Sequence, residues 1–513
     1  MTTATLSVMM MTVLAKISAF AREIVLSYAY GASAISDAYL ISQTIPRVIF
    51  SLVASGLATG FIPMYSRILS ARGRQEADRY TSNLVNVLLI AASIIVAIIL
   101  FLAKPVVKAF SSGFSGETLE LAAQLTRVGV FGIYFNGLIR VFAAYLRVHN
   151  NFVVPALVGL PANLVIVFAS FLSARTSIHV LALGTVVATA SEFLICLPFL
   201  RRTGYRYRRV LDLNDEHLRT LLSITLPVIV GTAIDDINVL VDRTIASAIT
   251  VGGISALNYA NRLTGFVQSV FVLSLTTVLY PALARVAADG DVRSLKSYLA
   301  EAMSLVGLLV VPATVGAMVF SRQIVGFLFG RGSFSADAVG LTSSALRFYA
   351  IGMTAVGLRS VLIRVFYSLQ DTKTPMMNST LGVVTNVVLN MLLSRFLGIG
   401  GLALATSIGG TVSTVLMLIA LRRKIGPLGF KAIAVSFLKI IAASSIMGLV
   451  AYGTFSVVSI LVGETLALVT SVGVGIVTYA ALACLTRIPV VLRTLAALRQ
   501  RLWTRNKHRR TEG

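Results

Sequence analysis

Long apolar segments separated by short polar connections run through the whole chain. Many contain about 20 residues with few or no charges, which is the length that a helix needs to cross a bilayer. Six of them cover residues 84–102, 153–172, 178–200, 300–320, 433–452 and 466–485. A β-barrel would instead show short segments that alternate between apolar and polar residues. The pattern therefore predicts an all-α polytopic membrane protein.

The apolar segments, taken with the polar residues between them, predict about fourteen transmembrane helices. Their expected ranges are 5–29, 33–66, 82–110, 121–149, 153–174, 178–201, 217–249, 255–287, 296–321, 337–369, 373–397, 399–424, 431–455 and 460–487. The most polar connection, at 201–219, separates the first six helices from the next six.

Residues of the first six predicted helices recur in the next six at a nearly constant spacing. Four recur 220 positions later and three recur 218 positions later. The pairs are Gly132 with Gly352, Gly137 with Gly357, Leu138 with Leu358, Pro155 with Pro375, Pro63 with Pro281, Arg67 with Arg285, and Tyr80 with Tyr298. This predicts two parallel six-helix repeats with the cargo site between them. The expected parts are an N-terminal lobe at 1–201, a C-terminal lobe at 202–424, helices 13 and 14 at 425–487 and a basic tail at 488–513.

Composition supports a membrane location, and the distribution of the positive charge along the chain indicates membrane topology. The 513 residues are 57% hydrophobic and only 12% charged, with a mean hydropathy of +0.87. A formal net charge of +24 could indicate a nucleic-acid partner, but lysine and arginine cluster in alternate short connections. By the positive-inside rule, these connections and both termini face the cytoplasm. We therefore expect a multi-pass membrane protein that binds no nucleic acid and whose basic tail contacts anionic membrane lipids.

Several charged residues lie within or at the edges of the first two predicted helices. They are Lys16, Arg22, Glu23, Asp37 and Arg47. An ionised side chain at the centre of a bilayer costs roughly 2.5–3.5 kcal/mol on insertion scales, unless it faces water, a partner or a ligand. Arg262 lies on the equivalent helices of the second repeat. Together these residues predict a polar cavity for an anionic cargo, because a guanidinium donates two-pronged hydrogen bonds to phosphate oxygens.

Structural roles compete with this interpretation. Each arginine could instead reach the membrane interface or close an ion pair. We expect such interfacial or interlobe positions for Arg140, Arg347, Arg359 and Arg364. Arg22 and Glu23 are neighbours on one helix, so their side chains should point about 100° apart and should not pair on one face.

A second group of residues offers oxygen ligands. Asn386 and Asn390 lie one turn apart, Thr406 is on the following helix, and Asp242 is an acid inside helix 7. Such oxygens suit a hard monovalent cation, whereas hydrogen bonding between helices is the alternative explanation. The sequence contains no nucleotide-binding loop, nucleophile elbow or metal-ligand cluster, so we expect a transporter and not an enzyme.

Longer motifs stand out along the chain. In the first two helices they are Phe20-Ala21-Arg22-Glu23, Gly31-Ala32, Asp37-Ala38-Tyr39, Pro46, Gly56 and Phe61-Ile62-Pro63. Further on they are Tyr259-Ala260-Asn261-Arg262-Leu263, Gly330-Arg331-Gly332-Ser333-Phe334 and the run from Phe366 to Pro375. These motifs resemble the MurJ/MviN lipid II flippases, members of the multidrug/oligosaccharidyl-lipid/polysaccharide exporter superfamily. The similarity covers essentially the whole chain.

The resemblance implies a fold, a cargo and a set of binding residues. Two six-helix lobes would enclose a cationic cavity for the head group of lipid II, and helices 13 and 14 would form a groove for its polyprenyl tail. The family's charged positions fall on Arg22, Arg262, Glu23 and Asp37, while Lys16 stands where an arginine is usual. Some relatives bind sodium, and the corresponding positions here are Asp242, Asn386, Asn390, Thr406 and the backbone carbonyl of Leu402.

The chain departs from the family pattern at two positions. Phe50 stands where many relatives have a further arginine, and Ser55 replaces an acid that commonly precedes Gly56. We hypothesise that Arg47, about one turn before Phe50, takes over the contact with phosphate.

The expected function is movement of lipid II from the inner to the outer leaflet of the bacterial cytoplasmic membrane by alternating access. We expect a monomer without an organic cofactor, and sodium is the candidate ion. The alternatives are a flippase for another polyprenyl-diphosphate oligosaccharide and a cation-coupled small-molecule antiporter. A non-transporting scaffold would leave the charged residues inside the membrane unexplained.

Overall fold

The computed structural model describes residues 3–486, 488 and 491, with side chains described except at 3–9, 52–59, 222, 224–233, 235, 277–278 and 430–432. Within these residues the chain forms eighteen α-helices and one π-helical segment and no strand. The chain divides into two units, Met1–Tyr259 with Leu328–Val339 and Ala260–Phe327 with Gly340–Gly513. Each unit is described by itself.

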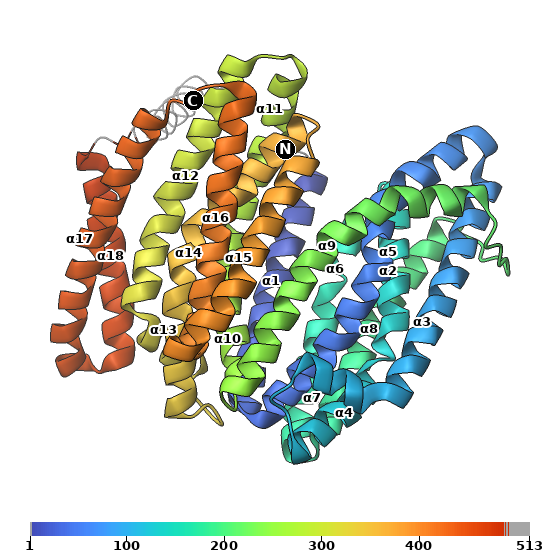
Figure 1. Ribbon diagram of the computed structural model, residues 1–513, viewed down its shortest axis with the longest axis horizontal. Helices are drawn as coiled ribbons and strands as arrows, with labels where there is room; N and C mark the ends of the chain where they lie inside the picture. Colours follow the sequence, from blue (N-terminus) through green and yellow to red (C-terminus); the bar gives the residue numbers. More distant parts are fainter. Residues whose placement is uncertain (1–2, 487, 489–490, 492–513) are drawn as a thin grey trace, which may run out of the picture. The chain divides into compact units, whose positions relative to one another are not determined.

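The first unit is built around α2, which contacts α3, α4, α5 and α9 (Figure 1). α1 packs against α6 and α7, and α8 packs against α4, α5 and α7. The bounds are α1 Thr3–Tyr30, α2 Ala34–Arg72, α3 Arg74–Phe110, α4 Gly116–Gly129, α5 Gly132–Val148, α6 Val153–Leu157, α7 Gly159–Arg175, α8 Ile178–Arg202 and α9 Glu216–Ile249. The unit also contains the start of α10, Gly253–Val267.

The second unit contains the rest of α10 and nearly all of the chain that follows. Its bounds are η1 Gln268–Leu273, α11 Ser274–Ala288, α12 Val292–Val319, α13 Ser321–Phe329, α14 Ala336–Ser368, α15 Lys373–Leu397, α16 Ile399–Ile425, α17 Phe430–Val462 and α18 Glu464–Leu485. α17 and α18 form an antiparallel pair (Figure 1), and α17 packs on α12. A Cβ atom on Gly307 of α12 would lie 2.9 Å from the ring of Phe437, so glycine allows this close packing.

The all-α membrane fold is confirmed. Each of the fourteen predicted ranges overlaps one helix or consecutive helices, although 460–487 begins inside α17 and α3 begins eight residues before its predicted range of 82–110. By length and apolarity, nine helices of the described residues can span a membrane, and up to eleven spans result when each of two bent pairs counts as one. The total of fourteen membrane spans therefore stays a prediction.

Matching loops in the two predicted repeats support a duplication. Asn150 and Gln370, which are 220 positions apart, are the two non-glycine residues with positive φ in the described chain, at 59° and 57°. The following residues repeat the same hydrogen bonds: Asn151 N donates to Leu146 O and Asp371 N donates to Phe366 O, each at 2.9 Å. The Oδ1 atoms of Asn151 and Asp371 also accept hydrogen bonds from the backbone N–H groups three residues later, at Val154 and Thr374 respectively. The lobe boundaries themselves stay predictions.

Two further loops of the first unit make corresponding contacts. Gly113 N, in the α3–α4 loop, donates to Ser247 Oγ near the end of α9 at 3.1 Å. Ser333 N, in the α13–α14 loop, donates to Tyr28 O near the end of α1 at 2.9 Å. A Cβ atom would lie 2.1 Å from Ser247 O if added to Gly113, and 2.4 Å from Tyr28 O if added to Gly332. Glycine is therefore required at both contacts.

Candidate functional site

A polar cluster surrounds Arg22 on α1, inside the first unit. Arg22 Nη2 lies 2.7 Å from Glu23 Oε1, and Arg22 Nη1 donates to Asn163 Oδ1 of α7 at 3.1 Å. Asn163 Nδ2 in turn donates to Ser18 Oγ at 2.9 Å. The prediction that Arg22 and Glu23 do not pair is wrong, because two long side chains can bend toward each other although their Cα–Cβ bonds diverge. Glu23 is buried, at 3% exposed, whereas the side chain of Arg22 is 23% exposed.

Asp37, which the resemblance placed among the substrate-binding residues, caps a helix in this structure. Its carboxylate accepts hydrogen bonds from Gly252 N at 2.8 Å, Ser255 N at 2.7 Å and Ser255 Oγ at 2.6 Å. A carboxylate at this place satisfies the free N–H groups at the start of α10 and interacts favourably with the helix dipole. Asp37 therefore joins the start of α2 to the start of α10.

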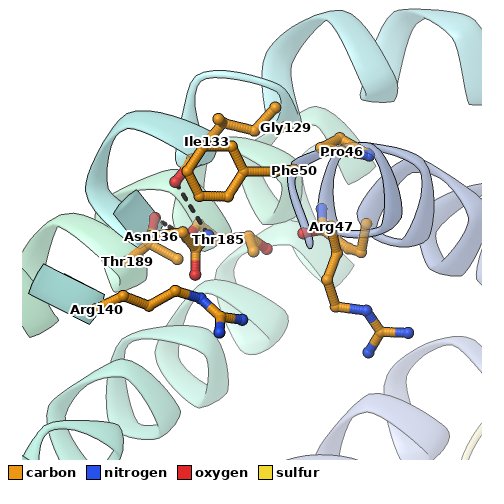
Figure 2. A pocket seen from close by; sticks show the side chains of 11 residues that line it. Pro46, Arg47, Phe50, Gly129, Ile133, Asn136, Arg140, Thr185 and Thr189 are labelled. Carbon is orange, nitrogen blue, oxygen red and sulfur yellow. Dashed lines mark hydrogen bonds between the residues drawn. The ribbon is translucent and has the colours of Figure 1, made fainter. Parts of the chain in front are cut away.

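A small pocket lies between α2, the α4–α5 break and α8, and it is lined by Arg47, which is exposed. Figure 2 shows the Arg47 and Arg140 side chains extending from α2 and α5 toward the same side of this pocket. The remaining lining residues are Gln43, Pro46, Phe50, Gly129, Gly132, Ile133, Asn136, Thr185 and Thr189. Arg140 is exposed, and its expected interfacial or interlobe position stays a prediction. The four-residue spacing of Asn136 and Arg140 is the sequence signal that could have revealed their shared face at this pocket.

Phe50 explains how α2 and α5 come together beside this pocket. Its side chain is 3% exposed, and a Cβ atom on Gly137 would lie 2.9 Å from its ring. The aromatic ring thus packs directly on the α5 backbone. Ser55, the second departure from the family pattern, lies outside the residues whose side chains are described.

The predicted residues Lys16 and Arg262, and a further arginine, Arg243, have different surroundings. Lys16 is exposed on α1. Arg243 of α9 donates to Leu40 O at 2.8 Å and also to Thr44 Oγ1, so it fastens α9 to α2 and has a structural role. Arg262 is exposed on the part of α10 that belongs to the second unit.

Four of the five predicted sodium ligands lie together in the second unit. Asn390 Nδ2 donates to Asn386 Oδ1 at 2.9 Å, Asn386 Nδ2 donates to Thr406 Oγ1 at 3.0 Å, and Thr406 Oγ1 donates to Leu402 O at 3.0 Å. Their amide, hydroxyl and carbonyl oxygens fit a hard cation. The fifth residue, Asp242, is 9% exposed on α9 in the first unit. Among the described residues, no group of three His, Cys, Asp or Glu side chains could hold a metal ion.

Comparison with known proteins decides the family. A sequence profile described as lipid II flippase MurJ matches residues 26–472. The chain belongs to this family. The MurJ-family chain is therefore a transporter and not an enzyme, as the sequence predicted, and the resemblance drawn from its motifs is confirmed.

Individual relatives extend over most of the chain. A probable lipid II flippase MurJ of Buchnera aphidicola subsp. Baizongia pistaciae is 27% identical over 419 residues, which are 80% of this chain and 82% of the relative. The lipid II flippase MurJ of Burkholderia cenocepacia is 26% identical over 82% of this chain and 84% of its own length.

Solved structures show the same fold. A lipid II flippase MurJ in an inward closed conformation has a TM-score of 0.81 and 24% identity, over 94% of this chain and 99% of that one. An inward-facing multidrug resistance MATE family transporter of the MOP superfamily has a TM-score of 0.70 and 17% identity, over 81% and 95% of the two chains. These likenesses show that the three chains share a fold.

Proposed function

We propose that this MurJ-family protein flips lipid II across the bacterial cytoplasmic membrane, with both termini in the cytoplasm and as a monomer. The observation that carries the proposal is the Arg22–Glu23–Asn163 cluster, in which a partly exposed arginine is held by two buried partners. The chain that contains it matches the family over residues 26–472. Charged groups inside a membrane protein are expensive and mark substrate pathways. An arginine held in place by two partners is prepared for an anionic head group, since less side-chain entropy is lost on binding.

Alternating access is the mechanism that these contacts suit. The contacts of Asp37, Gly113 and Gly332 join loops that carry few basic residues, which the positive-inside rule assigns to the outer side. With these contacts intact, the ends of the helices on that side are held together. Release of the head group outside then requires these hydrogen bonds to break, and binding energy must favour the open state for transport to proceed.

The polyprenyl tail is proposed to run along α17 and α18. Large apolar side chains on this pair are strongly exposed, including Leu449 at 73%, Ile460 at 84% and Val477 at 70%. Apolar side chains facing outward suit contact with lipid chains. The pair is anchored to the second unit by Tyr479, whose hydroxyl donates to Leu308 O at 2.8 Å.

Sodium is proposed as the coupling ion, held by the oxygens of Asn386, Asn390, Leu402 and Thr406 in the second unit. The ion would supply a positive charge that stabilises one transport state. We expect sodium to raise the melting temperature of the parent in detergent and to leave that of Asn386→Leu unchanged. Potassium at equal ionic strength is the control, and an equal rise with both cations would contradict a specific site.

The functional test is rescue of a bacterium depleted of its own lipid II flippase. The parent should restore growth, while Arg22→Ala should fail at equal membrane abundance, because it removes the charge and leaves Glu23 buried beside Asn163. Arg347→Ala, which truncates an exposed arginine of α14, is the matched control and should rescue. A parent that is abundant in the membrane but fails to rescue would contradict lipid II transport.

A flippase for another polyprenyl-diphosphate oligosaccharide is the second candidate. The observation that favours it is Phe50, which occupies with an apolar ring a position where many MurJ relatives have an arginine. Failure to rescue lipid II transport, together with restored export in a strain lacking a flippase for such an oligosaccharide, would support it.

A further inference from the structure

One membrane helix of the second predicted repeat changes its winding in the middle. Between α10 and α11, the backbone of η1 at Gln268–Leu273 forms a π-helix, the one such segment in the described chain. A π-helix has i→i+5 hydrogen bonds, so about one residue more fits into a turn than in an α-helix. The axis also bends by 41° just after η1, where one part ends at Thr276 and the next begins at Leu279. Short π-helical segments are frequent at functional sites.

The first predicted repeat has the same length at this place but no π-helix. Ala38 and Ala256 lie before the segment, Pro63 and Pro281 lie after it, and both pairs are 218 positions apart. The second repeat therefore contains no inserted residue. The counterpart of η1, residues 50–55, lies inside α2, which is α-helical throughout. An unbroken α-helix can thus accommodate the same number of residues.

A glutamine holds η1 against α14. Gln268 Nε2 donates a hydrogen bond to Met353 O at 2.5 Å. A Cβ atom on Gly357, one turn later on α14, would lie 3.6 Å from Gln268 Oε1 and 3.2 Å from Val272 Cγ2. The glycine therefore lets η1 approach the backbone of α14 closely. The side-chain amide adds a hydrogen bond to this approach, which an apolar side chain cannot provide.

The corresponding contact in the first repeat is apolar. At the spacings of 218 and 220, Phe50 is the counterpart of Gln268 and Gly137 is the counterpart of Gly357. A Cβ atom on Gly137 would lie 2.9 Å from the ring of Phe50, so these two residues are also in contact. The fold thus needs a close approach at this place in both repeats, but it does not need an amide. Polar side chains inside membrane helices are costly and mark function.

A change of η1 to an α-helix would turn one part of the helix against the other. Each residue of an α-helix turns the chain by about 100°, so losing the extra residue of the π-helical turn rotates α10 relative to α11 by about that angle. A side chain about 5 Å from the axis then moves by about 8 Å. α11 packs on α12, and the guanidinium of Arg364 on α14 lies 5.4 Å from the ring centroid of Tyr280 on α11. Because these contacts hold α11, the turning part is α10, which carries the exposed Arg262.

The other end of α10 is held by the Asp37 cap. The carboxylate accepts hydrogen bonds from the N–H groups of Gly252 and Ser255, and a rotation of α10 moves both groups away from it. α10 can therefore turn only when the cap is broken. This couples the winding of η1 to the contact that closes the outer ends of the helices.

We propose that η1 is a winding switch of the transport cycle and that Gln268 is its positioning residue. While the amide binds Met353 O, η1 stays π-helical and Arg262 keeps its described direction. When the amide is released, η1 becomes α-helical and α10 turns. This rests on the proposed flippase function, in which Arg262 is an expected substrate-binding residue. Small rotations and shifts of packed helices are recurring elements of switching transitions.

A deletion tests the winding apart from the side chains. Val270 of η1 is 44% exposed. Deleting it removes the extra residue, so η1 becomes α-helical while α10 and α11 keep their described directions, and the switch is locked. The deletion should keep a melting temperature close to that of the parent but fail to rescue cells depleted of their lipid II flippase. Val270→Ala, which keeps the number of residues, is the matched control and should rescue. Deletion of Leu52, its counterpart in α2, should lower the melting temperature strongly, because it removes a residue from a regular helix.

Substitutions at Gln268 test the positioning role. A hydrogen bond between membrane helices shifts an equilibrium by about 3- to 20-fold. Gln268→Leu keeps the volume and loses the hydrogen bond, so it should slow transport by a factor in this range at an unchanged melting temperature. Gln268→His keeps an N–H donor and should retain most of the transport activity.

Distances between spin labels report the winding without relying on transport. Labels are attached at Asn261 on α10 and Ile351 on α14, both exposed, after replacement of the two native cysteines. Gln268→Leu should add a second distance that differs from that of the parent by several ångströms. Combining it with the deletion of Val270 should remove this second distance. Lipid II added to the parent should increase its population.

The outcomes separate the two proposals. If the Val270 deletion rescues as well as the parent, or if Gln268→Leu leaves the distances unchanged, the winding switch is wrong and the flippase function stands. A Val270 deletion that is as unstable as the Leu52 deletion would show that η1 holds no extra residue, which also overturns the switch. A parent that is abundant but fails to rescue contradicts the flippase function, whereas the label distances still decide whether η1 changes its winding.

Discussion

Removing the Asp37 carboxylate should open the contact between the starts of α2 and α10. The carboxylate is 1% exposed and accepts three hydrogen bonds. In Asp37→Ala the Ser255 hydroxyl retains an acceptor, Gly252 O at 3.1 Å, but the N–H groups of Gly252 and Ser255 lose theirs. Two orphaned donors cost about 2–6 kcal/mol. Taking about 3 kcal/mol, the ratio of closed to open molecules falls on the order of a hundredfold.

Accessibility of the adjacent loop measures this change. A single cysteine at Ala32 is introduced after replacement of Cys196 and Cys484, and intact cells are treated with a maleimide that does not cross membranes. Asp37→Ala should raise the labelling rate strongly. Asp37→Asn should raise it less, because the amide keeps one oxygen that accepts a hydrogen bond.

A second capping aspartate provides the matched control. Asp291 caps α12 by accepting from Ser294 N at 3.0 Å, in a loop that is predicted to face the cytoplasm. Asp291→Ala removes the same kind of contact elsewhere and should leave labelling at position 32 unchanged. Equal labelling of the parent and Asp37→Ala at equal abundance would refute the view that this cap holds the outer ends together.

Three further changes test the packing and the loops. In thermal unfolding, Gly332→Ala should destabilise the protein more than Gly290→Ala. Both glycines have positive φ, at 65° and 70°, but only at Gly332 would the added Cβ lie 2.4 Å from a backbone oxygen. Similar losses of stability in the two variants would contradict the steric argument. Phe50→Ala should cost about 3–5 kcal/mol by leaving a cavity against Gly137, whereas Phe101→Ala, at a side chain 85% exposed, should cost little. Partial burial raises the pKa of Asp371, but hydrogen bonds from Lys424 and Thr374 outweigh it and lower the pKa to about 2. The stability from this loop should therefore be complete above about pH 4 and disappear as the pH falls toward 2. Lys424→Met should remove part of that acid sensitivity of the melting temperature.

Helix ranges could be predicted from the sequence because each apolar segment must satisfy its backbone hydrogen bonds internally within a membrane. The exceptions are local. The break between α4 and α5 follows Gly129 without a proline, and α13 is a separate short helix at Ser321–Phe329. Apolar periodicity cannot locate such breaks, since the residues on both sides remain equally apolar.

The candidate site was harder to predict, because its residues come from distant parts of the sequence. Arg22 was identified from its cost in the membrane, but its partner Asn163 lies 141 positions away. Asp37 was recognised as an important acid, yet its role depends on the start of α10, which no local pattern connects to it. The neighbours of Arg140 in the pocket could not be predicted, because a single arginine in a helix does not indicate which other helices its face meets.

The two repeats show how duplication separates fold from function. The loops of Gly113 and Gly332 occur once in each predicted repeat, and each contacts a helix of the other repeat, at Ser247 and at Tyr28. The loops at Asn150 and Gln370 also occur once in each repeat. Contacts that appear twice support the architecture, since both repeats need the same loop and helix-end contacts. The hydrogen-bonded π-helical contact of Gln268 occurs in the second repeat, whereas the counterpart of Gln268 in the first is the apolar Phe50. Exchange at this position therefore distinguishes the two roles: Gln268→Phe should slow transport with little loss of stability, whereas a change at a duplicated glycine should affect stability first.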